Sequence, residues 1–178
     1  MSDLGNTFAD NLAPAFAAVI RNWFNAHLDF AEAVSIVDIS GDVDQYPPQE
    51  PGTSDLNPAS MLVVNLPRVV IVPGDGEEAI YQSGNMRIPV EIQCKADLDT
   101  GGYPQAKALF TATLDAVQQA DLITQLNAAT DINNNQLVGV QGIVITGVRL
   151  NETGDRMFVK TITVDCFGYS VPVTQPGG

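Results

Sequence analysis

The sequence predicts an α+β fold with a mostly antiparallel sheet, and three observations lead to that prediction. Apolar residues near the N-terminus repeat at helical spacing. Residues 86–96 alternate between apolar and polar without a break, and two β-rich segments near the C-terminus are joined by a short polar turn. The 178 residues suit one domain with a full core, which we assign to residues 1–170, with a flexible C-terminal tail at 171–178.

The first predicted element is an N-terminal helix with a single apolar face. That face is formed by Phe16, Val19, Ile20, Trp23, Phe24 and Leu28. Pro14 suits the first turn of this helix and Asn11 is a candidate cap, so we expect the residues before them to form a short turn or an arm. A short strand follows at 34–39.

The segment from 41 to 58 changes character, because it holds four prolines among Gly, Asn and Asp residues. No regular element runs through such a segment, so we interpret it as a long loop inserted in the domain. The β-rich segment 61–72 comes next. Pro67 interrupts it, which predicts an edge strand or a bulge. Turns are expected at 73–76 and 83–85.

The clearest strand is 86–96, which alternation predicts to be half buried against an apolar layer. We expect that layer to be a second helix packed on one face of the sheet. It starts near Pro104 and has Leu109, Phe110, Leu114 and Val117 on one stripe. A shorter helix is expected within 121–129. The chain closes with a β-hairpin of 142–150 and 156–167, in which Lys160 falls on the apolar face without an explanation from sequence.

The composition is acidic, with 8 Lys and Arg against 21 Asp and Glu and a formal net charge of −13. Such a surface repels phosphate backbones, so specific nucleic-acid binding is not expected. Cys94 and Cys166 are too few for a disulfide framework and lie at apolar positions of strands, so we interpret them as buried small hydrophobic residues. The sequence shows neither a signal peptide nor an apolar run that spans a bilayer, so we expect a soluble cytoplasmic protein without membrane contact.

We find no catalytic, cofactor-binding or metal-binding constellation, and we expect no enzyme activity. His27 is the only histidine and has no nucleophile or acid near it in sequence. The stretch 74–79 resembles a dinucleotide-binding turn but lacks the long helix that should follow. Two stretches, starting at Asp97 and Asp131, match part of a calcium loop. Both lack the terminal bidentate Glu, so we interpret their polar residues as turn residues.

The chain resembles the tail terminator (tail-tube capping, or tail completion) proteins of long-tailed bacteriophages. The resemblance covers residues 61–169 and the leading helix. It is carried by the strand MRIPVEIQCKAD, the helix YPQAKALFTATLDAVQQA, and the hairpin halves GIVITGVRL and MFVKTITVDCFGY. The order of a helix, a strand group, a second helix and a closing hairpin is also the order of that family.

This resemblance implies a structural virion protein in the tail or neck, assembled in the host cytoplasm. It implies a homo-oligomeric ring, usually a hexamer, that ends tail-tube polymerisation at the head-proximal end and docks the neck. The implied partners are other copies of the chain, the tail tube protein and a neck or connector protein, while DNA passes through an acidic lumen without specific binding. Pro67 and Pro89 indicate exposed strand edges that can pair with a neighbouring subunit.

The chain departs from the compact form of the family at the insertion 41–58 and at the tail 171–178. We expect both to contact other subunits or partners, because a single monomer seldom buries such loops. The candidate interface residues are Tyr46, Pro47, Pro48, Asp75, Glu77, Glu78, Asn151, Glu152 and Asp155.

Three alternatives stay open at this point. The chain is also compatible with a neck or head-completion (head-to-tail connector) protein, or with a subunit at the distal end of the tail. A monomeric acidic binding module, holding a basic partner or calcium through its loops, belongs to a different class. An enzyme of an unfamiliar kind is the most remote of these readings.

Overall fold

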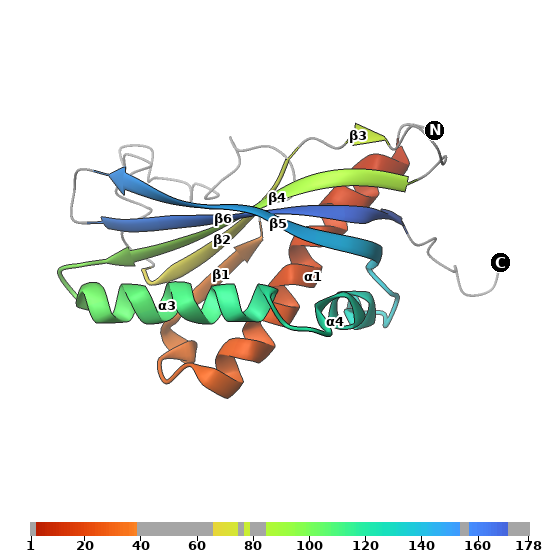
Figure 1. The fold of residues 1–178 in the computed structure, drawn as a ribbon. Coiled ribbons are helices and arrows are strands. Elements are labelled where there is room, and N and C mark those ends of the chain that lie inside the picture. Colours follow the sequence, from red (N-terminus) through yellow and green to blue (C-terminus); the bar gives the residue numbers. More distant parts are fainter. Residues whose placement is uncertain (1–2, 39–65, 75–76, 79–84, 154–156, 171–178) are drawn as a thin grey trace, which may run out of the picture.

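A computed structural model gives the structure of the chain and describes residues 3–38, 66–74, 77–78, 85–153 and 157–170 (Figure 1). The helical elements are α1 (Asp3–His27), the 3₁₀ turn η1 (Ala31–Ala33), α3 (Gly102–Val117) and α4 (Leu122–Ala128). The strands are β1 (Ser35–Asp38), β2 (Arg68–Pro73), β3 (Glu77–Glu78), β4 (Asn85–Asp97), β5 (Val138–Thr153) and β6 (Met157–Ser170). The predicted insertion at 41–58 and the predicted tail at 171–178 lie outside the described residues.

The strands form one sheet in the order β1-β2-β4-β6-β5, and β3 pairs with one end of β4. Only β1 and β2 run parallel; β2–β4, β3–β4, β4–β6 and β5–β6 are all antiparallel. The predicted closing hairpin is β5–β6. Together with the N-terminal helix and the helix α3 packed on one face, it confirms the predicted α+β fold with a mostly antiparallel sheet.

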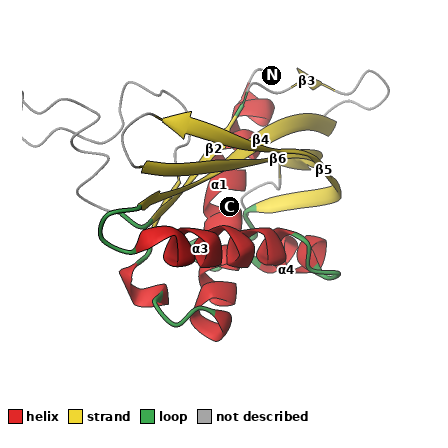
Figure 2. Ribbon diagram, turned by 60° about the vertical axis from the view of Figure 1, so that its left-hand side comes forward, coloured by secondary structure: helices red, strands yellow, loops and turns green. Residues whose placement is uncertain are grey.

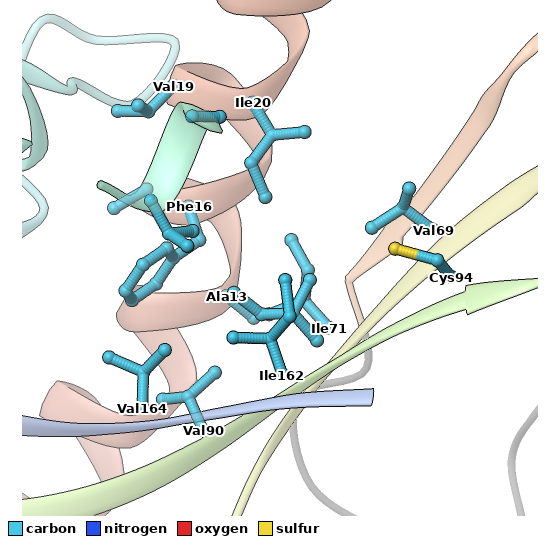
Figure 3. Close-up of a cluster of buried hydrophobic side chains, with 14 of the residues drawn as sticks. Ala13, Phe16, Val19, Ile20, Val69, Ile71, Val90, Cys94, Ile162 and Val164 are labelled. Atoms are coloured by element: carbon cyan, nitrogen blue, oxygen red, sulfur yellow. The ribbon is translucent and has the colours of Figure 1, made fainter. Parts of the chain in front are cut away.

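The helices α1, α3 and α4 lie on one face of the sheet (Figures 1 and 2). The predicted alternation of β4 is confirmed, because Ile88, Val90, Ile92 and Cys94 are all fully buried on this face. Figure 3 shows how the core forms: Ala13, Phe16, Val19 and Ile20 of α1 approach Val69 and Ile71 of β2, Val90 and Cys94 of β4, and Ile162 and Val164 of β6. Burial of apolar side chains from both layers is therefore what holds the helices to the sheet.

The helix α1 begins at Asp3, well before the cap at Asn11 that the sequence predicted. Pro14 lies inside it instead of in its first turn, and the Asn11 amide donates to the carbonyl of Leu137 (3.2 Å) instead of capping the helix. A proline inside a helix costs about 3 kcal/mol. Phe8 and Leu12 are fully buried and extend the apolar face, and each contributes about 1.5–3 kcal/mol, which offsets that cost.

The two strand prolines do not mark sheet edges, so that prediction is wrong. Pro67 precedes β2, which lies between β1 and β4, and its carbonyl accepts a hydrogen bond from the backbone N–H of Ser35 (3.1 Å). Pro89 lies in β4, the strand that pairs on both sides. It occupies a gap in the ladder, because the pairing with β2 ends at Val90 and the pairing with β3 begins at Arg87. A residue without an N–H donor is tolerated in that gap.

The structure also explains Lys160. Its ammonium group lies 4.0 Å from the centroid of the Phe110 ring of α3, so the charge faces an aromatic ring on the apolar side of β6. The aliphatic part of the side chain can then pack with its apolar neighbours while the charge is still stabilised.

Candidate interface at the β5 edge

The strand β5 forms one edge of the sheet, and β1 forms the other. The β1 edge has only 4 residues, and the guanidinium of Arg21 in α1 fixes the chain that leads into it. That guanidinium donates to the carbonyls of Ala31 (2.8 Å) and Val34 (2.6 Å). The β5 edge is 16 residues long, and no strand of the described residues pairs with its outer side. A long unpaired edge offers free backbone donors and acceptors to another chain.

The beginning of β5 is closed by α4 and by the loop that follows it. The side-chain amide of Asn127 donates to the carbonyl of Val140 (2.9 Å) and accepts from its N–H (2.6 Å). The backbone N–H of Leu137 donates to the carbonyl of Ala129 (3.1 Å). Val138 and Val140 are consequently buried, and the Asn127 amide takes the place of a neighbouring strand at this point of the edge.

The end of β5 is open. Register shifts fall between Val140 and Gly142 and between Ile145 and Gly147, and beyond them the strand pairs regularly with β6 as far as Thr153. Val148 and Leu150, which lie on the helix-facing side of this regular stretch, are 46% and 55% exposed. They are exposed because α4 packs against the start of β5 whereas α3 packs over β4 and β6. We call Val148 and Leu150 the open corner.

The open corner continues a packed apolar surface. Leu150 pairs across the strands with Lys160, and Val148 pairs with Ile162, which is fully buried. Between these strands and α3 lie the Lys160–Phe110 contact and an edge-to-face contact of Tyr103 with Phe158 (ring centroids 6.2 Å apart). The corner is therefore the uncovered margin of the core, and it differs from apolar residues scattered singly on a surface.

The strand β5 contains a single carboxylate residue, Glu152, near its end. No Asp or Glu occurs between Asp131 and Glu152, and no longer run without a carboxylate exists in the sequence. The only charged side chain in that run is Arg149, whose nearest carboxylate oxygen is that of Glu91 at 3.7 Å. Two copies of a chain with a net charge of −13 repel each other, and an edge with few carboxylates adds little to that repulsion.

The loop before β5 presents an apolar residue on a structured turn. The Asp131 carboxylate accepts hydrogen bonds from the backbone N–H groups of Asn133 (2.8 Å) and Asn135 (2.9 Å) and from the Asn135 amide (3.1 Å). The bonds from Asn135 are the main cause of a lowered pKa of Asp131. Ile132 lies between these residues and is 98% exposed. As expected, the polar residues of this stretch act as turn residues.

A second apolar group lies on the opposite face of the sheet, at the beginning of the β5–β6 pair. Tyr169 and Phe167 of β6 are 40% and 37% exposed and pair with Gly139 and Gly142 of β5. The Tyr169 ring lies over Gly139, where a Cβ atom would be 2.5 Å from a ring carbon. Glycine is needed at 139 because the aromatic ring occupies the space of a side chain.

In the described part of the chain, the two cysteine thiols are buried and the side chain of His27 is exposed. Burial raises the pKa of Cys94 to about 12, and the pKa of Cys166 is raised mainly by burial and further by Asp165. Both thiols are therefore unreactive at neutral pH, as expected for buried small hydrophobic residues. His27 is exposed and its ring stacks on Trp23 (centroids 3.8 Å apart). Within the described ranges, no three His, Cys, Asp or Glu residues are grouped to hold a metal ion.

The predicted interface residues do not come together in one place. Tyr46, Pro47, Pro48, Asp75 and Asp155 lie outside the described residues. Glu77 and Glu78 form β3 and pair with Arg87 and Met86, at one end of β4. Asn151 and Glu152 end β5 and pair with Val159 and Phe158, which face the other end of β4. The two pairs are separated by roughly 30 Å along the sheet.

Sequence reasoning missed Ile132, Val148 and Leu150, the residues that define the candidate interface. The hairpin pattern placed Val148 and Leu150 in a strand, but their exposure depends on where α3 and α4 lie over the sheet. One signal was present: the long run without a carboxylate in an otherwise acidic chain. Such a run within a predicted hairpin strand indicates a surface that other copies can approach.

The comparisons with known proteins name no family. No protein-family model matches the chain, and no curated protein matches it. Two solved structures from Akkermansia muciniphila, one of them of a protein without its transmembrane region, show a weak likeness. Their TM-scores are 0.34 and 0.31 at 12% identity, with 97% and 91% of this chain and 87% and 88% of theirs covered. Likeness at this level supports no conclusion about function. None of the helices in the described ranges is long and apolar enough to cross a membrane.

Proposed function

We propose that the chain is a non-enzymatic structural subunit that assembles with copies of itself into a ring. The observation that carries this proposal is the open end of β5, where Val148 and Leu150 are exposed and fall in the run 132–151, which holds no Asp or Glu. Soluble monomers usually protect a sheet edge with charges, prolines, short strands or bulges. Here the bulges lie before the open corner, and the stretch of β5 after them holds no proline and two charged residues, Arg149 and Glu152.

Within that class, we propose the role of tail terminator in a bacteriophage, at the head-proximal end of the tail tube. The support is the sequence resemblance described above and the order of elements, which is helix, strands, helix and closing hairpin. A ring of about six subunits would contact the tail tube on one side and the neck on the other. The net charge of −13 suits a ring through which DNA passes without binding.

The test is the mass and shape of the purified protein, measured by light scattering and negative-stain microscopy. We expect a ring with a central hole in the wild-type protein and a monomer in Leu150→Glu. Asn22→Glu is the matched control, because it adds the same charge at an exposed position of α1 and should still form rings.

A protein that stays monomeric at every concentration, and also does not bind to the ends of its tail tubes, would rule out the proposed role. Rings that bind a head connector but leave the length of polymerising tubes unchanged would instead assign the chain to the neck.

A further inference from the structure

We draw no further inference here: the strongest candidate, the exposed apolar patch of Val144, Phe167 and Tyr169 on the face of the sheet opposite the helices, carries none because nothing in the described part of the chain shows what covers it.

Discussion

The two ends of β5 belong to one strand and have different surroundings. At the beginning, α4 lies over the strand, the Asn127 amide occupies both backbone groups of Val140, and Val138 is fully buried. At the end, Val148 and Leu150 are about half exposed although their positions in the strand are equally apolar. The exposure is decided by the length and position of the helices and not by the strand itself.

This difference indicates where the fold is complete and where it is not. The closed beginning satisfies its backbone groups and buries its side chains within one chain, so it needs no partner. The open end leaves both an apolar surface and an edge available, and its two exposed apolar residues fall in the run 132–151, which holds no Asp or Glu. The same strand therefore anchors the fold at one end and offers an interface at the other.

The largest expected effect is at the closed end, in Gly168→Ala. An added Cβ atom would overlap the carbonyl oxygen of Gly139 and lie 2.8 Å from a ring carbon of Phe8. Neither the backbone of β5 nor the buried ring can easily move, so the free energy of unfolding should fall by about 3 kcal/mol. Urea denaturation measures the loss. A change below about 0.5 kcal/mol, the usual size for a surface substitution, would show that the closed end is not tightly packed.

The next effect is expected for Asn127→Ala, which removes the amide that closes the edge at Val140. The N–H and carbonyl of Val140 would lose their partners, and leaving buried polar groups unpaired costs about 1–3 kcal/mol. Hydrogen exchange should also speed up at Val140 more than at residues of β4. Asn127→Gln is a useful comparison, because it keeps the amide but displaces it.

The sequence was sufficient to predict the elements whose surroundings are local. When one face of a helix or strand is buried, apolar residues recur along it with the period of that element. This repeat is visible in the sequence for β4, for α3 and for the β5–β6 hairpin. The predictions for Pro14 and Pro89 were wrong, because they considered only the local cost of a proline. The burial of Phe8 and Leu12 offsets that cost for Pro14, and a gap in the hydrogen-bond ladder removes it for Pro89. Lys160 stayed unexplained for the same reason, since its partner Phe110 comes from another element.

The candidate interface was less predictable than the fold. Loops and charged turns were favoured from sequence, whereas the structure draws attention to an edge strand and to one apolar turn residue. Exposure of Val148 and Leu150 is a tertiary property, because it results from α3 packing over β4 and β6 while α4 covers only the start of β5. No pattern within the strand distinguishes its covered half from its open half.

A smaller effect on stability, measured as a function of pH, should show whether the exposed region around Leu150 extends as far as β4. Cys94 of β4 lies in the same cross-strand row as Leu150 and Lys160, yet it is fully buried. Its pKa is raised from 9.0 to about 12 by burial, so the folded state favours the protonated thiol. This stabilisation is complete below pH 9 and is lost as the pH rises toward 12, by at most about 1.4 kcal/mol per pH unit.

We therefore expect a shallower decline of stability between pH 9 and pH 10 in Cys94→Ala than in the wild-type protein, measured by urea denaturation at each pH. The native protein should also leave both thiols unmodified by a thiol reagent at pH 8. Rapid modification of Cys94 at pH 8 would show that solvent reaches β4 and not only the edge strand β5.

The smallest expected effect is at the open end, in Gly147→Ala, and its sign should be opposite to that of Gly168→Ala. No atom lies within 4 Å of a Cβ built at Gly147, and its backbone is not in the left-handed region that favours glycine. An alanine there restricts mainly the unfolded chain, which should raise the stability of the monomer by about 0.4–1 kcal/mol. Because both glycines lie in the β5–β6 pair, the two substitutions compare its closed and open ends with the same change of one methyl group. If Gly147→Ala destabilises the monomer as much as Gly168→Ala does, then β5 is packed at Gly147 as tightly as at its beginning, on the face opposite to Val148 and Leu150.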